Sequence, residues 1–348
     1  MTRVRTAMRG TSAQMQSAGG SAHPSQRMTR RLRMAFGSLG TSEEYRPSSA
    51  GATSRARREW GNIRAVMSTA RRTVSANGLR FALLEEGTGP LVLLLHGFPD
   101  TAHTWDGVRP ALARAGFHAV SPYMRGYAPT TIPSKPAYDA DTLGRDVLGL
   151  IDALGKKRAI VVGHDWGAVA AYSAAALGRE RIALLVTVAV PHPAAVRPTP
   201  RLVWHARHFL SFQRKGAAAK LRANDFADVD ALVRRWSPDW DFPPTETAAV
   251  KTAFREPGSL EAALGYYRAY GIRLPPSLRK PIAVDTVCFA PTHDLFDRQP
   301  YDRAKRSFTG GYVVVRLPGG HFTHRERPEP FMEALLRVLK PPRVASKR

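Results

Sequence analysis

One aspartate in this chain lies at a junction between two local patterns. Residues 160–162 form a β-branched run that ends at Gly163, and an alanine-rich run begins just after Gly167. This order predicts a strand, a very tight turn and a helix, with Asp165 at the tip of the turn. The spacing has the form of the nucleophile elbow G-x-S-x-G, with aspartate in place of serine. We therefore expect Asp165 to be a nucleophile in a strained turn that only small flanking residues allow.

Two further residues could complete such a site. Asp294 follows the apolar run 283–290, and His321 follows the run 312–317. Ligands bind at the carboxyl ends of the strands in open α/β sheets, where all three residues are expected. The chain order is nucleophile, acid, base. Asp297 is a rival for the acid and His324 for the base, and we favour Asp294 and His321.

Strand and helix patterns alternate from residue 72 to residue 190. Asn77-Gly78 is a strong hairpin signal between the first two strands. The apolar run Leu91 to Leu95 should be buried on both faces of a parallel sheet. The expected strands are 72–75, 79–84, 91–95, 118–123, 158–162, 182–190, 283–290 and 312–317, and the expected helices are 105–115, 139–154, 166–177 and 330–339. The predicted fold class is α/β, with a mostly parallel central sheet flanked by helices.

The alternation breaks at Pro191-His192-Pro193. Residues 193–280 are mostly helical in pattern and rich in aromatic side chains, so we interpret them as an inserted helical lid, or cap. The two parts of the α/β core are then residues 67–192 and 281–348.

Residues 1–66 differ in composition from the rest of the chain. They contain twelve Arg, three Glu and no Lys. Such a segment is typical of an organellar transit peptide. The alternative that we favour is a disordered basic extension, or sequence upstream of the true start. Met67 precedes the organised sequence, and we expect the working protein to begin there.

Composition and charge exclude several classes of protein. The net charge of +24 could suggest nucleic-acid binding, but its excess is spread along the chain and no nucleic-acid-binding motif accompanies it. The longest apolar runs are far shorter than the ~20 residues that span a bilayer. A single cysteine, Cys288, permits no intramolecular disulfide. We expect a cytoplasmic protein with neither nucleic-acid nor membrane partners, and we leave its oligomeric state open.

The motifs taken together resemble the α/β-hydrolase fold family, in its branch of epoxide hydrolases and haloalkane dehalogenases. The resemblance covers roughly residues 70–340 and rests on His96-Gly97-Phe98-Pro99, on the segment around Asp165, and on Gly320-His321-Phe322. It implies hydrolysis of a small hydrophobic epoxide or halide, without a cofactor or a metal.

A carboxylate nucleophile suits attack on a saturated carbon. Asp165 would displace the leaving group and form an alkyl ester, which splits one hard step into two easier ones. His321 would activate the water that hydrolyses the ester, and Asp294 would hold the imidazole ring. The backbone N–H groups of Phe98 and Trp166 are the expected oxyanion donors.

Opening an epoxide also requires an acid for the oxygen that leaves. The resembled epoxide hydrolases use lid tyrosines, and Tyr267 matches one of them. Tyr267 and Trp166 are therefore expected to contact the substrate, although Tyr267 could instead only pack in the lid. Ser211 stands where the second tyrosine is expected, and His208 or Tyr270 could replace that tyrosine in space.

Two other functions stay open. A dehalogenase would bind halide through the indole N–H of Trp166 and of a lid tryptophan such as Trp204, Trp236 or Trp240, although Phe98 favours the epoxide hydrolases. A non-catalytic small-molecule binding protein of the same fold is the alternative of another class. We expect His164 to be a structural neighbour of the nucleophile, and Asp100, Asp141 and Asp146 to be loop or helix-surface residues.

Overall fold

A nine-stranded sheet forms the centre of the computed structural model, which describes residues 43–44, 70–271 and 273–339. The strand order is β1-β9-β8-β7-β6-β4-β5-β3-β2. Pairing is parallel except along β3, which runs antiparallel to both β2 and β5. The strands are β1 (Glu43–Glu44), β2 (Ala70–Ala76), β3 (Leu79–Glu86), β4 (Leu91–Leu95), β5 (His118–Pro122), β6 (Ala159–His164), β7 (Ile182–Val188), β8 (Thr286–Pro291) and β9 (Tyr312–Leu317).

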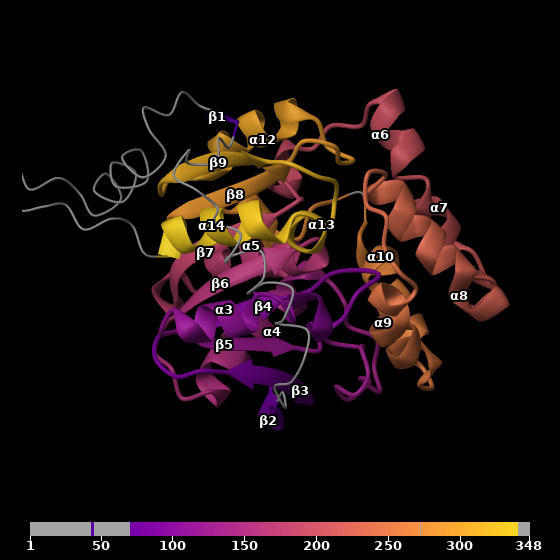
Figure 1. The fold of residues 1–348 in the computed structure, drawn as a ribbon, viewed down its shortest axis with the longest axis horizontal. Helices are drawn as coiled ribbons and strands as arrows, with labels where there is room; N and C mark the ends of the chain where they lie inside the picture. Colours follow the sequence, from indigo (N-terminus) through magenta and orange to yellow (C-terminus); the bar gives the residue numbers. More distant parts are fainter. Residues whose placement is uncertain (1–42, 45–69, 272, 340–348) are drawn as a thin grey trace, which may run out of the picture.

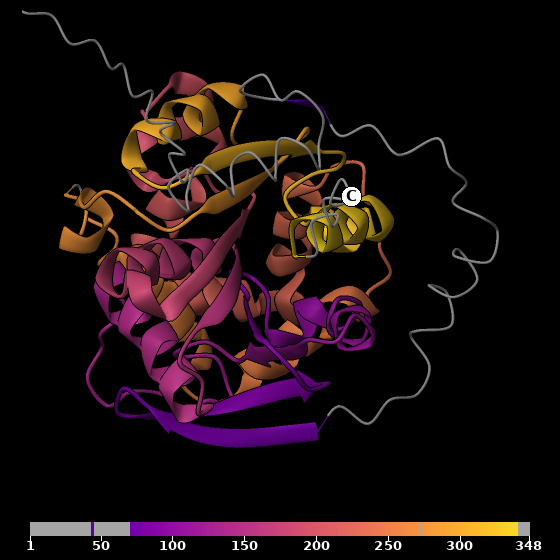
Figure 2. The same ribbon diagram turned by 90° about the vertical axis from the view of Figure 1, so that its left-hand side faces the viewer.

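Helices cover both faces of this sheet, as expected for parallel strands that are apolar on both sides. Figure 2 shows α4 (Ala140–Ala153) and α5 (Trp166–Leu177) on one face, with α3 (Arg109–Arg114) and α14 (Pro328–Leu339) on the other. Each face has its own buried apolar cluster. The fold class predicted from the sequence is therefore confirmed.

The remaining helices are short or belong to the lid. The lid elements are α6 (Pro200–His205), α7 (His208–Gln213), α8 (Ala217–Trp236), α9 (Thr245–Arg255) and α10 (Ser259–Ala269), and Figure 1 shows them to the right of the sheet. The short core elements are η1 (Ala102–Trp105), η2 (Arg179–Arg181), η3 (Pro193–Ala195), α11 (Pro276–Arg279), α12 (Arg298–Ala304), η4 (Lys305–Ser307) and α13 (Thr323–Glu326). α11 packs against α4 and α5, so the chain has returned to the core by residue 276.

Several elements differ from their predicted bounds for local reasons. The expected helix 105–115 is divided into η1 and α3, and Pro110 lies in the first turn of α3. β7 ends at Val188 rather than at residue 190, because Ala189 adopts a φ of 65° that a strand cannot continue. Asp139, expected as the first residue of its helix, is instead the N-cap of α4 and accepts a 3.0 Å hydrogen bond from the backbone N–H of Thr142.

Three aspartates expected on loops or on a helix surface are buried, which corrects that prediction. Asp146 pairs with Arg125 at 2.6 Å, and Asp141 accepts a 2.5 Å hydrogen bond from the hydroxyl of Ser277. Asp100 pairs with Arg325, as described below. Buried carboxylates need such partners, and these come from segments distant in the sequence.

The extension predicted for residues 1–66 lies outside the described residues, apart from Glu43–Glu44. These two residues form β1, which pairs in parallel with β9. Among the helices that the structure describes, none is both long enough and apolar enough to cross a membrane.

Candidate active site

Asp165 occupies the tight turn between β6 and α5. β6 ends at His164, α5 begins at Trp166, and the aspartate between them has φ 51° and ψ −118°. Positive φ is uncommon for a residue other than glycine and marks a strained backbone. A Cβ atom at Gly167 would collide with the carbonyl oxygen of Leu95 on the neighbouring strand. The glycine therefore permits the close approach that the turn requires.

The carboxylate of Asp165 is held at both oxygens. The backbone N–H of Phe98 donates a 2.8 Å hydrogen bond to Oδ1, and Nε2 of His321 lies 3.5 Å from Oδ2. Burial raises the pKa of Asp165, but the His321 ring, His164 and the Phe98 N–H outweigh burial and leave this pKa below its usual value. The carboxylate of Asp165 is therefore ionised at neutral pH.

His321 lies between two carboxylates. Its Nδ1 is 2.9 Å from Oδ1 of Asp294, while its Nε2 faces Asp165. Burial lowers the pKa of His321, but the charges of Asp294 and Asp165 and their hydrogen bonds outweigh it and raise this pKa to about 10. The site therefore holds an imidazolium ring between two carboxylates. All three predicted residues are brought together.

The rival residues lie elsewhere. Asp297 is the exposed N-cap of α12 and accepts a hydrogen bond from the backbone N–H of Gln299. His324 contacts the hydroxyl of Thr104 through Nε2, at 2.7 Å. His164 lies behind the site, where its Nε2–H donates to the backbone oxygen of His321 at 3.0 Å. Within the described part of the chain, neither Asp297 nor His324 is paired with Asp165.

Tyr267 lies among aromatic side chains close to Asp165. Its ring centroid is 5.1 Å from that of Trp166, 5.2 Å from that of Phe98, and 4.8 Å and 4.9 Å from those of Phe209 and Phe212. Burial and the Asp165 charge raise the pKa of Tyr267 well above 10, against the opposing effect of a hydrogen bond with Trp166. The phenol therefore keeps its proton across the neutral range.

The position of the second lid tyrosine does not face the site. Ser211 is exposed, and its hydroxyl donates to the backbone oxygen of His208 at 2.9 Å. His208 is buried, with its ring centroid 5.6 Å from that of Tyr267. Burial lowers the pKa of His208 to about 3, so its ring is neutral, and its Nδ1–H donates to the backbone oxygen of His205. Tyr270 contacts Trp166, with 5.7 Å between ring centroids.

The three lid tryptophans have different environments. Trp204 is exposed on α6, and Trp240 packs against Phe242 and Phe322. Trp236 is buried, and its ring centroid lies 5.1 Å from that of His321. Its indole N–H has no partner among the described residues. Of the three, Trp236 is the one placed beside the catalytic candidates.

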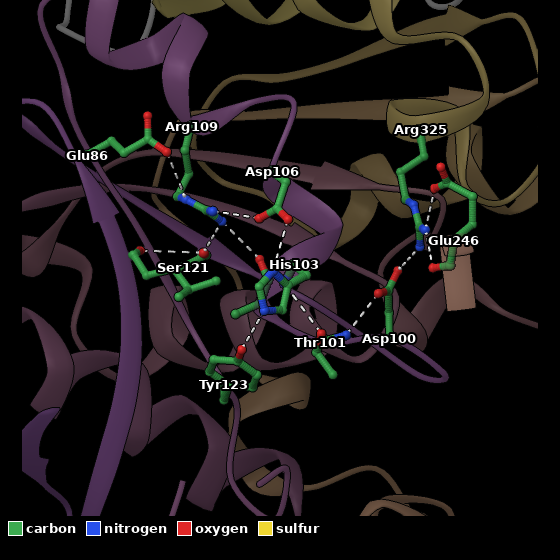
Figure 3. A network of polar contacts seen from close by, with 12 residues as sticks. Glu86, Asp100, Thr101, His103, Asp106, Arg109, Ser121, Tyr123, Glu246 and Arg325 are labelled. Atoms are coloured by element: carbon green, nitrogen blue, oxygen red, sulfur yellow. Dashed lines mark hydrogen bonds and ion pairs between the residues drawn. The ribbon is translucent and has the colours of Figure 1, made fainter. Parts of the chain in front are cut away.

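One residue that the sequence did not suggest connects three parts of the site. Arg325, four residues after His321, donates to Oδ2 of Asp100 at 2.8 Å and to Oε2 of Glu246 at 2.6 Å. Figure 3 shows this guanidinium between the two carboxylates. Asp100 is two residues from Phe98, and Glu246 is on lid helix α9. The contact therefore joins the loop after β4, helix α13 and lid helix α9. Its only sequence signal was charge, which does not reveal a partner 225 residues away.

No metal site stands out among the residues that the structure describes, since no group of three or more His, Cys, Asp and Glu side chains could hold an ion. The residues around Asp165 offer an ionised carboxylate, an imidazolium ring, a neutral phenol and a backbone N–H donor.

Comparisons with known proteins agree with this geometry. Residues 90–328 match the family model described as alpha/beta hydrolase fold. Epoxide hydrolase A of Mycobacterium tuberculosis is 31% identical over 316 residues, which cover 77% of this chain and 96% of that protein. An AB hydrolase superfamily protein of Bacillus subtilis is 28% identical, with the same coverage of the two chains. The crystal structure of Epoxide Hydrolase A from Mycobacterium thermoresistibile is 28% identical, with a TM-score of 0.66, and the match covers 78% of this chain and 98% of that chain. The chain belongs to the α/β-hydrolase fold family, in its epoxide hydrolase-like branch.

Proposed function

We propose that this enzyme converts small apolar epoxides to vicinal diols through an ester on Asp165. The observation that carries the proposal is the arrangement around this carboxylate. One oxygen accepts the Phe98 N–H, the other faces His321, and the neutral phenol of Tyr267 lies close by. The aromatic side chains around Tyr267 favour an apolar substrate. The single, buried and unpaired Cys288 fits the cytoplasmic location that we also propose.

The first step forms the ester. Oδ2 of Asp165 attacks an epoxide carbon, and the carbon–oxygen bond breaks. The oxygen that leaves would be an alkoxide, so it takes the proton of Tyr267, whose own oxygen is the weaker base. Tyr267 then takes up the proton of the His321 imidazolium. His321 is thereby neutral when the ester is complete.

The second step hydrolyses the ester. Neutral His321 takes a proton from water, and the hydroxide attacks the carboxyl carbon of Asp165. The charge that develops on Oδ1 is stabilised by the Phe98 N–H, and we assign the Trp166 N–H as the second donor. Loss of one such donor typically costs ~3 kcal/mol of barrier. Collapse releases the diol, which takes its last proton from the new carboxyl group. The cycle ends with His321 charged again.

We assign Tyr270 rather than His208 as the companion of Tyr267. His208 is neutral, and its one N–H is already donated to a backbone oxygen. It therefore offers an acceptor where epoxide opening needs a donor. Burial raises the pKa of Tyr270, so that side chain keeps its O–H, and it packs against Trp166.

The test uses purified protein with a panel of apolar epoxides and haloalkanes, scored for diol and for halide. Asp165→Asn should abolish turnover. His321→Gln should accumulate an ester, detected as the added substrate mass on the peptide that contains Asp165. Asp294→Asn and Asp297→Asn make the same substitution, but only Asp294 contacts His321, so the first should lose most activity and the second little. Normal turnover by His321→Gln would overturn the mechanism.

Haloalkane dehalogenase is the second candidate, and one observation favours it. The indole N–H of Trp236 is buried beside His321 without a described acceptor, and a halide ion could accept its hydrogen bond. Halide release from haloalkanes, together with no diol from any epoxide in the same panel, would reverse our ranking.

A further inference from the structure

The outer surface of the lid exposes large apolar side chains. Val203, Trp204 and Leu210 are 54%, 66% and 68% exposed, and they are the exposed large apolar residues of the described chain. All three lie on α6 and α7, and α6 has no buried residue at all. Apolar residues normally turn a helix towards a core. A group of exposed apolar side chains on neighbouring elements instead marks an interaction surface.

The same segment is strongly basic. Residues 197–222 contain no Asp or Glu and seven cations, Arg197, Arg201, Arg207, Arg214, Lys215, Lys220 and Arg222. Arg197, Arg201, Arg214 and Lys215 are exposed, whereas Arg222 pairs with Glu261. The guanidinium of Arg207 lies 4.5 Å from the centre of the Trp204 ring. We call residues 197–222 the basic rim.

Figure 1 places the basic rim at the edge of the molecule away from the body of the sheet. The acidic residues of the lid begin at Asp225, within a break in α8 at residues 223–226. Cations and exposed apolar side chains thus occur together in the basic rim, which contains no acidic residue. Such a surface complements negative charge over a hydrocarbon layer.

We propose that the basic rim docks this enzyme onto an anionic lipid bilayer. Trp204, Val203 and Leu210 enter the interfacial region, while the arginines and lysines contact lipid phosphates. Peripheral contact of this kind needs no spanning run, so the short apolar runs that argued against a membrane partner do not bear on it. The proposal is independent of the hydrolase activity, because it rests on the outer surface alone.

The test is sedimentation of the purified full chain with vesicles. One vesicle is phosphatidylcholine, and the other contains phosphatidylglycerol as well. Wild-type protein should bind the anionic vesicle much more tightly, and added salt should weaken this binding. Arg201→Gln/Arg214→Gln should weaken it by about tenfold to thirtyfold, as expected for two surface cations. Trp204→Ser/Leu210→Ser should weaken it as well, through lost apolar contact.

The matched control is Lys157→Gln/Arg179→Gln. It also removes two cations, which lie next to the starts of β6 and β7, at the end of the sheet opposite the lid. It should bind like the wild type. Equal binding to both vesicles, or equal losses in the control and the rim variants, would overturn the proposal. The proposal would also be overturned if the wild type were a dimer that Trp204→Ser/Leu210→Ser converts to a monomer without changing vesicle binding. A second copy of the chain would then cover this surface.

Discussion

In the mechanism that we propose, His321 acts in both steps. Two carboxylates hold its proton before the reaction, at a pKa of about 10. Formation of the ester removes the charge of Asp165 and leaves Asp294 alone. The pKa of His321 must therefore fall during the cycle, which is what a base for water requires. The same ring can supply a proton in the first step and accept one in the second.

This change in charge predicts different pH profiles for the two steps. The rate of single-turnover ester formation should be constant from acidic pH upwards and should fall near pH 10, because this step requires ionised Asp165 and charged His321. Ester hydrolysis should increase with pH through a lower pKa, because it requires neutral His321. Stopped-flow measurements with a slow epoxide separate the two rates. The same pKa near 10 in both steps would show that loss of the Asp165 charge does not lower the pKa of His321.

At the scale of elements, the site depends on contacts between several elements rather than on one helix or strand. The loop after β4, helix α13 and lid helix α9 meet at Arg325, whose side chain is 14% exposed. Asp100 is more deeply buried than the arginine. A buried carboxylate is costly without its cation, so this contact stabilises the three elements in one arrangement.

Arg325→Gln should therefore be strongly destabilising. Removing one partner of a buried ion pair typically costs about 3–5 kcal/mol. Arg222→Gln is the matched control, since it removes a lid arginine that pairs with Glu261 in a more exposed position and should cost under about 1 kcal/mol. Denaturant unfolding followed by fluorescence gives both values. Similar losses of unfolding free energy in the two variants would show that burial does not strengthen the Arg325 contact.

Across the whole molecule, several histidines are buried in neutral form. Burial lowers the pKa of His96 and His192 to about 4 and that of His164 and His208 to about 3. In the unfolded chain each has a pKa of about 6.5. Between these values the unfolded chain binds more protons than the folded one. Stability from these groups is therefore present above pH ~6.5 and lost as pH falls towards 4.

Each such histidine should contribute a slope of up to ~1.4 kcal/mol per pH unit to the unfolding free energy in this range. His192→Phe should remove about one proton from the linkage, because its ring packs against Tyr172 and Phe308 and a phenyl ring can occupy the site. Denaturant unfolding at several pH values measures this slope, and an unchanged slope in His192→Phe would refute the linkage.

Local patterns in the sequence determined most of the fold. The apolar run Leu91–Leu95, the helix Trp166–Leu177 and the strand Tyr312–Leu317 have the bounds that periodicity predicted. Such elements are specified by neighbouring residues. The placement of Asp165, Asp294 and His321 after the parallel strands β6, β8 and β9 also followed from order along the chain, because parallel strands bring their carboxyl ends to one edge.

Contacts between distant segments were decided only by the tertiary structure. The burial of Asp100 depends on Arg325, and the orientation of Ser211 away from the site depends on how α7 packs against α10. The exposure of Val203, Trp204 and Leu210 in the basic rim likewise depends on how α6 and α7 pack. Sequence spacing determines which residues share a face of an element. Which element that face meets, and which buried charge finds a partner there, is determined by the packing of the whole chain.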